Sequence, residues 1–109
     1  MLSFLNIALD RSERRQQVVE LVISPAENAL RVRSDDTNFD RTLNVPEPVR
    51  IVTVEPPLVN SRGPEEQRRF LIYPGGTLPR IAIDLMTKDG RKRQVLVDPV
   101  TGIARAEAQ

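Results

Sequence analysis

Carboxylates are the side chains of this sequence that could carry out acid–base chemistry, because it contains neither histidine nor cysteine. Two acidic pairs are adjacent along the chain, Asp35 with Asp36 and Glu65 with Glu66. A catalytic pair of carboxylates shares a proton or flanks a scissile bond, so the two groups must face one another. Neighbouring side chains in an extended loop point apart. We therefore expect neither pair to be catalytic and predict that the protein is not an enzyme.

Oxygen ligands for a metal ion are concentrated in one segment, at Asp35, Asp36, Asn38 and Asp40. Calcium prefers such ligands. The segment lacks the glycine at the sixth position and the glutamate at the twelfth that an EF-hand loop requires. We interpret these acids as solvated and predict no metal site and no cofactor.

Two further motifs have simpler structural interpretations. Gly75 and Gly76 are not followed by the lysine and hydroxyl residue of a phosphate-binding loop, so they are expected to form a turn. The basic run Arg91–Arg93 lies in an alternating segment, where cations on a sheet edge discourage unwanted strand pairing. The formal net charge is +1, and one tyrosine and three phenylalanines are too few for base stacking. We predict no nucleic-acid partner and no small-molecule substrate.

The elements that position these residues begin with a helix. Leu2, Leu5 and Leu9 recur at helical spacing, with Phe4 beside them, and the pattern predicts a helix over residues 2–15. No Ser, Asp or Asn precedes it as a cap, which is typical of a segment that starts inside a longer helix or of a frayed terminal helix. No stretch of the sequence approaches the roughly 20 apolar residues that span a bilayer.

After Gln17 the apolar period changes from helical spacing to two, which indicates β-strands. A hairpin is expected over Val18–Arg33, and residues 34–40 are expected to form a polar loop. Residues 58–67 are expected to form an exposed loop. Asp89 and Gly90 favour a type I′ hairpin turn, because both residues tolerate positive φ. The further strands are expected at residues 49–54, 69–73, 80–85, 93–98 and 103–106.

A helix followed by six or seven short strands predicts a segregated α+β fold. This number of strands is too large for one flat layer, so we expect an N-terminal helix packed on two small antiparallel sheets, as in a sandwich. We assign residues 1–15 to the helix and residues 16–109 to the antiparallel β domain.

Three stretches of this sequence resemble the minor pseudopilins of type II secretion and the related minor pilins of the GspH/FimT type. Phe4–Ile23 is similar to the exit of that family's helix into its first strand. Phe70–Ile83 is similar to its aromatic strand, glycine turn and next strand. Gln94–Arg105 resembles its closing strand, Asp-Pro-x-Thr-Gly turn and terminal strand. The family's peptidase site, early glutamate and membrane-spanning half-helix are not in this sequence, so either they precede it in the full protein or the likeness covers the β domain alone.

The resemblance implies a structural component of a type II secretion pseudopilus or type IV pilus tip, with other pseudopilins or minor pilins as partners. It also implies a precursor anchored in the bacterial inner membrane by an N-terminal helix, with this domain on the periplasmic side. Assembly contacts are then expected on the helix, at Leu2, Phe4, Leu5 and Leu9, which alternatively pack on the chain's own sheet. Partner choice is expected from the loop residues Asn60, Arg62, Glu65 and Glu66.

The alternative hypothesis is a soluble β-sandwich binding module for carbohydrate or peptide. It predicts a concave or aromatic-lined site near residues 58–67.

Overall fold

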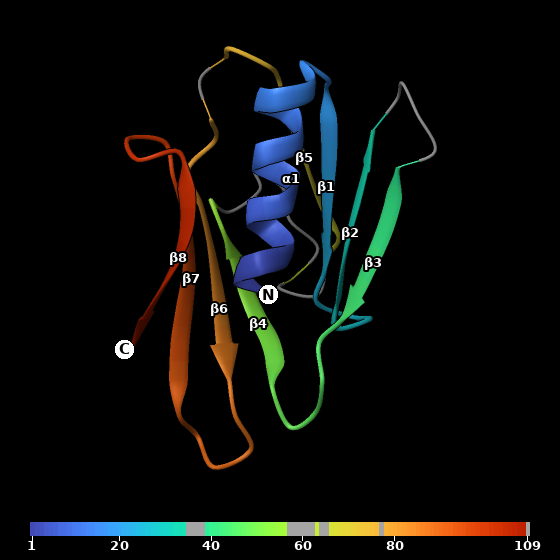
Figure 1. The fold of residues 1–109 in the computed structure, drawn as a ribbon. Coiled ribbons are helices and arrows are strands. Elements are labelled where there is room, and N and C mark those ends of the chain that lie inside the picture. Colours follow the sequence, from blue (N-terminus) through green and yellow to red (C-terminus); the bar gives the residue numbers. More distant parts are fainter. Residues whose placement is uncertain (35–38, 57–62, 64–65, 77, 109) are drawn as a thin grey trace.

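One helix and two antiparallel sheets make up the described part of the chain (Figure 1). The computed structural model describes residues 1–34, 39–56, 63, 66–76 and 78–108. The helix is α1 (Leu2–Arg15), and the strands are β1 (Val19–Ser24), β2 (Ala29–Ser34), β3 (Asp40–Asn44), β4 (Arg50–Glu55), β5 (Arg68–Ile72), β6 (Ile81–Met86), β7 (Lys92–Asp98) and β8 (Ile103–Ala108). The predicted α+β class, with its leading helix and two sheets, is confirmed.

The helix α1 has the bounds that the apolar spacing predicted. Its stripe of Leu5, Ala8 and Leu9 is buried, because residues three and four apart share one helix face. Met1 occupies the N-cap position without a side-chain hydrogen bond. Gln16 caps the end of the helix, and its left-handed φ of 52° turns the chain towards β1.

The strands are divided between two four-stranded sheets. The first has the order β3-β2-β1-β5 and the second has the order β4-β6-β7-β8, with antiparallel pairing throughout. The period-two patterns decide which face of each strand is buried. In β1, Leu21 and Ile23 face the core, whereas Glu20 lies on the outer face with Arg33 and Arg69.

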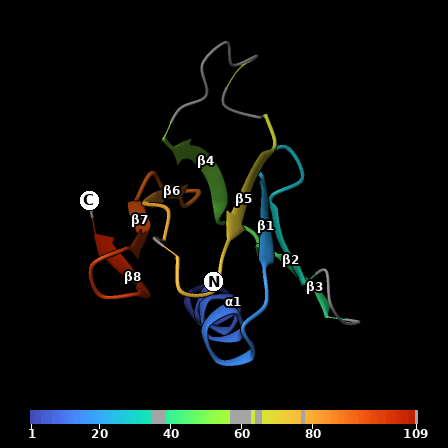
Figure 2. The ribbon, with the colours of Figure 1, turned by 90° about the horizontal axis from the view of Figure 1, so that it is seen from above.

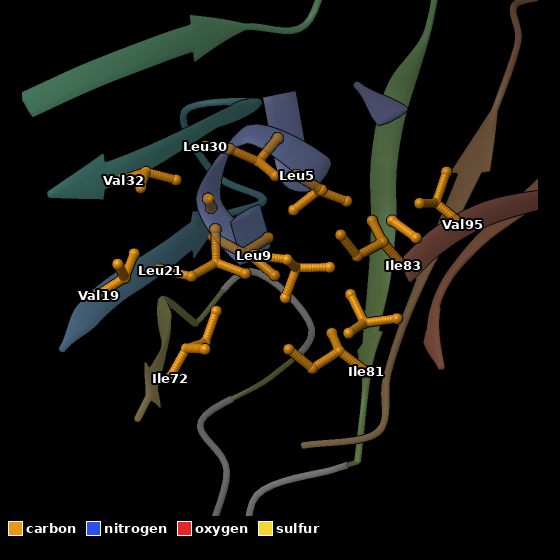
Figure 3. Packing of buried hydrophobic residues seen from close by; sticks show 14 of the residues in the cluster. Leu5, Leu9, Val19, Leu21, Leu30, Val32, Ile72, Ile81, Ile83 and Val95 are labelled. Atoms are coloured by element: carbon orange, nitrogen blue, oxygen red, sulfur yellow. The ribbon is translucent and has the colours of Figure 1, made fainter. Parts of the chain in front are cut away.

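Viewed from above, the two sheets diverge from β4 and β5, and α1 lies in the opening between them (Figure 2). A single hydrophobic cluster joins all three layers. Figure 3 shows Leu5 and Leu9 of α1 between Leu21 and Leu30 of the first sheet and Ile81 and Ile83 of the second. Each fully buried side chain of this kind contributes about 1.5–3 kcal/mol of transfer free energy. The helix is therefore an integral part of the core.

Two buried polar side chains connect the sheets. The amide of Asn28, in the β1–β2 turn, donates to the carbonyl oxygens of Val45 (3.3 Å) and Val49 (2.8 Å) and accepts from the N–H of Ile51 (2.8 Å). Arg68 of β5 donates to the carbonyl oxygens of Val54 and Pro56 at the end of β4. These bonds satisfy backbone groups along β4, an edge strand, where the two sheets meet.

The prediction of a polar loop over residues 34–40 is wrong at both ends. Ser34 belongs to β2, Asp40 opens the unpredicted strand β3, and residues 35–38 lie outside the described part of the chain. Strand β3 is exposed apart from the half-buried Leu43, so it lacks the alternation that marks a half-buried strand. Pairing with β2 forms it, supported by the ion pair between Arg31 and Asp40.

The hairpin between β6 and β7 is confirmed, but the predicted type I′ turn is wrong. Gly90 has a φ of 88°, whereas Asp89 is absent from the positive-φ residues of the described chain. The N–H of Gly90 donates to the oxygen of Thr87 (3.0 Å), and the N–H of Thr87 donates to the oxygen of Arg91 (2.9 Å). The loop therefore has three residues, and such loops place a single left-handed glycine at the last position.

Candidate docking groove

Large apolar side chains are exposed at six positions of the described chain, and four of them surround one groove. These four are Ile7, Tyr73, Val100 and Ile103. The groove has a volume of about 990 Å³ and lies between α1, the turn after β5 and the β7–β8 turn. Contiguous apolar exposure of this kind marks interaction sites more often than scattered single residues do.

Ile7 supplies the helical wall of the groove. It lies two residues from both Leu5 and Leu9, which turns it by about 200° onto the opposite helix face. Its side chain is 56% exposed, whereas that of Leu5 is 1% exposed. An isoleucine opposite the buried stripe is the signal in the sequence that could have identified this wall.

The β7–β8 turn presents Val100, which is 92% exposed. The Asp98 carboxylate accepts from the N–H of Val100 (2.8 Å), and the Asp98 carbonyl accepts from the N–H of Gly102 (2.8 Å). Gly102 has a φ of 74°, which a glycine adopts without steric cost. The hydrogen bond from Val100 is also the main reason why the pKa of Asp98 lies below its ordinary value. The turn is therefore held closed while its valine points into solvent.

The turn after β5 forms the third wall and carries Tyr73. The N–H of Gly76 donates to the oxygen of Tyr73 (3.2 Å), and the N–H of Gly75 lies 3.5 Å from the Glu13 carboxylate on α1. The predicted glycine turn is confirmed here. Two side chains of α1 connect the end of β5 to the helix. Glu13 does so through Gly75, and the hydroxyl of Ser12 lies 3.4 Å from the oxygen of Ile72.

Asn6 connects α1 to the start of β8. Its side-chain amide donates to the oxygen of Ala104 (3.3 Å) and accepts from the N–H of Ala104 (2.9 Å). One asparagine thus pairs with both backbone groups of an edge-strand residue, as a neighbouring strand would. This pair joins α1 to β8 next to Ile7 and Ile103, which both line the groove.

The charged residues among the described lining of the groove are both acidic, Asp10 and Glu13. Asp10 forms an exposed ion pair with Arg14, with 2.8 Å between Oδ1 and Nε. Glu13 therefore remains as the main source of net charge along this wall.

The assembly residues predicted on the helix face the chain's own core. Leu5 and Leu9 are buried, while Leu2 and Phe4 are half-buried against the hydrophobic cluster. Of the two alternatives for this helix face, the structure has the one in which it packs on its own sheets. Leu9 alone of these four lines the groove.

The predicted partner loop is described only in part, because Asn60, Arg62 and Glu65 lie outside the described residues. Glu66 is half-buried, and its N–H donates to the oxygen of Gly63 (3.2 Å). It lines a different surface, the charged outer face of the first sheet near Arg31 and Arg69. The structure does not bring Glu66 to the groove.

Two carboxyl groups outside the groove, those of Glu20 and Asp40, have pKa values below their ordinary values, and each shift has a structural cause. Glu20 accepts hydrogen bonds from Arg69 and Arg33, and the bond from Arg69 contributes most to holding the pKa of Glu20 below 4.5. Asp40 is held below its ordinary pKa chiefly by its hydrogen bond with Arg31. Among the described residues, no three acidic side chains converge as a metal-binding group.

Comparisons with family models, curated proteins and solved structures find no match to this chain. No helix in the described part of the chain has the length and apolar character needed to cross a membrane. The geometry of the groove is therefore the basis for a functional hypothesis.

Proposed function

We propose that this chain is a minor pseudopilin or minor pilin of the GspH/FimT type, a structural component of a type II secretion pseudopilus or type IV pilus tip. It acts by filament assembly and protein–protein contacts on the periplasmic side of the bacterial inner membrane. Its partners are other pseudopilins or minor pilins, and a membrane helix upstream of this domain anchors the full-length protein. The proposal combines the sequence resemblance with the α+β architecture.

The observation that carries the proposal is the apolar groove along α1. The element that buries Leu5 and Leu9 in the core also exposes Ile7 to solvent beside Val100 and Ile103. A neighbouring subunit that covers these side chains gains hydrophobic free energy, which favours association without any chemical reaction. The helix thus serves the fold on one face and assembly on the other.

The alternative is a soluble binding module for carbohydrate or peptide. The sequence placed its site near residues 58–67, most of which lie outside the described part of the chain, and the groove offers this function a different concavity. Tyr73 is the aromatic residue among its described lining residues. A tyrosine with an apolar ring and a polar hydroxyl is typical of binding surfaces, and it is the observation that favours this second candidate.

A crosslinking experiment in the native bacterium tests the proposal. A photoreactive amino acid replaces Ile7 or Val100 in the full-length protein, and mass spectrometry identifies the crosslinked products. We expect crosslinks to other pilin-type subunits of the cell envelope. A matched variant carries the same group at Leu71, which is exposed outside the groove on the outer face of the first sheet, and it should give few such products.

Two results would contradict the proposal. The first is a native gene that encodes no apolar segment of about 20 residues upstream of this domain, since a bilayer anchor needs that length. The second is crosslinking from Ile7 that yields no pilin-type subunit. Retention on a glycan array that is lost on Tyr73→Ala would instead support the binding-module alternative.

A further inference from the structure

The backbone groups around the groove determine which kind of polypeptide it can accept. Five N–H groups of lining residues or of their neighbours in the chain already have acceptors, and they belong to Gly75, Gly76, Val100, Gly102 and Ala104. The oxygen of Ala104 also accepts from Asn6. An extended peptide binds a sheet edge through main-chain hydrogen bonds, and these groups offer it few.

An extended peptide seated against Ile7, Val100 and Ile103 would therefore find few partners for its own N–H and C=O groups among the backbone groups of the walls. Each buried polar group left unpaired costs about 1–3 kcal/mol. An α-helix forms its backbone hydrogen bonds internally and avoids this cost. The occupied backbone at Ala104 thus favours a helical occupant over a strand.

The shape of the groove agrees with a helix. One wall follows α1 from Ser3 through Ile7 and Asp10 to Glu13, a span of about 15 Å at 1.5 Å per residue. Ser3, Gly76 and Gly102 are small lining residues, which leave room for a neighbouring backbone. Ile7, Val100 and Ile103 provide apolar contacts for side chains that project from one face of a bound helix.

The charge of the groove indicates what flanks the apolar face of that helix. Asp10 and Glu13 are the charged residues of the described lining, and both are acidic. Arg14 pairs with Asp10, so Glu13 contributes most of the unbalanced charge. A lysine or arginine on the bound helix next to Glu13 would complement it, and complementary charge mainly sets specificity and association rate.

We propose that this groove binds an amphipathic α-helix of a partner protein, with its apolar side chains between Ile7, Val100 and Ile103 and a basic side chain beside Glu13. The inference rests on the proposed function in one respect, since it names the partner chemistry for the same docking surface. It names a helix and not an extended segment as the occupant, and binding of a second copy of this chain is a contrary outcome of the test below.

Two displayed peptide libraries of equal diversity test this inference. In one, peptides of about 15 residues present randomised positions on one face of a helix-forming scaffold, a length at which isolated helices become marginally stable. In the other, prolines at regular intervals hold peptides of the same length extended. Clones that bind the chain are then screened against Ile7→Asp and against the control Leu71→Asp, after circular dichroism has shown that both variants fold.

We expect the clones that require Ile7 to come from the helical library and to carry Lys or Arg beside the apolar face. Their binding should fall at least about tenfold on Ile7→Asp and stay unchanged on Leu71→Asp, and Glu13→Lys should shift the selected flanking residue to Asp or Glu. The inference is overturned if clones that require Ile7 come mainly from the extended library, or if neither library yields any. Sedimentation that shows a dimer of this chain abolished by Ile7→Asp overturns it as well.

The outcomes separate this inference from the proposed function. A chain that crosslinks to pilin-type subunits through Ile7, but whose groove selects no helical peptide, defeats the inference alone. A chain whose groove selects basic helices, but that never contacts a pilin-type subunit in the cell, defeats the proposed function alone.

Discussion

Asn28 connects the two sheets through its side-chain amide, and its replacement tests whether this connection holds the fold together. The amide donates to the oxygens of Val45 and Val49 and accepts from the N–H of Ile51. Replacement by alanine leaves these three backbone groups without that partner in a largely buried location. Asn28 also has a φ of 54°, and this left-handed conformation is less favourable for alanine than for asparagine or glycine.

The magnitude follows from these contacts. An unpaired buried N–H at Ile51 costs about 1–3 kcal/mol, and each weakened carbonyl acceptor costs about 0.5–1.5 kcal/mol. We therefore expect Asn28→Gly to lower the free energy of unfolding by about 3 kcal/mol. Asn28→Ala should cost about 1 kcal/mol more, because it adds the penalty of the left-handed conformation. These losses are large against the roughly 5–15 kcal/mol of a typical domain.

Urea unfolding followed by circular dichroism measures these differences, with the slope m checked for constancy across the variants. Asn44→Ala, at an exposed position of β3, serves as the matched control and should change stability by less than about 0.5 kcal/mol. A loss below about 1 kcal/mol for Asn28→Ala would show that the amide does not join the sheets. A glycine variant less stable than the alanine variant would refute the conformational part of the reasoning.

Four further substitutions test other parts of the structure. Leu5→Ala should lower the free energy of unfolding by about 2–5 kcal/mol because Leu5 is buried. Ile7→Ala, on the exposed helix face, should change it by less than about 0.5 kcal/mol. Equal losses for the two variants in urea unfolding would contradict the orientation of α1. Glu20→Gln should make the free energy of unfolding fall less steeply as the pH is lowered into the acid range. The hydrogen bond from Arg69 holds the pKa of Glu20 below 4.5, so its stabilisation is present above that pH and is lost as the pH falls through the lowered value. If the free energy of unfolding falls with decreasing pH at the same rate in the wild type and the variant, this role is disproved. Gly102→Ala should cost about 1–2 kcal/mol in thermal unfolding, since φ is 74° and nothing obstructs an added Cβ, and an unchanged midpoint would argue against the turn geometry.

Much of the secondary structure was predictable because it depends on local periodicity. The stripe Leu2, Leu5 and Leu9 predicted α1 with its bounds, and alternation predicted the strands that have one buried face, such as β1 and β6. Strand β3 was not predictable in this way. Its residues are mostly polar and exposed on an edge, so hydrogen bonding to β2 creates the strand and leaves no hydrophobic period in the sequence.

The candidate groove was harder to predict than the fold. Its exposed large apolar residues come from three places far apart in the sequence, at Ile7, at Tyr73, and at Val100 with Ile103. They lie within the three stretches that carry the family resemblance, but no pattern marks them as functional, and each alone is an ordinary exposed hydrophobic residue of a globular protein. The helix residues that drew attention in the sequence, Leu5 and Leu9, are the ones that the core buries.

The amino-acid sequence by itself determined the class of fold, since the change from helical spacing to alternation after Gln17 specifies a helix followed by strands. It also determined which helix face becomes buried, because apolar side chains at positions three and four apart share one face. Only the tertiary structure decided how two sheets open around α1 and how Asn28 and Asn6 satisfy backbone groups of distant strands. These pairings join residues with no local relationship, so no pattern of neighbours records them. The packing that brings them together also leaves Ile7 beside Val100 and Ile103 at the surface.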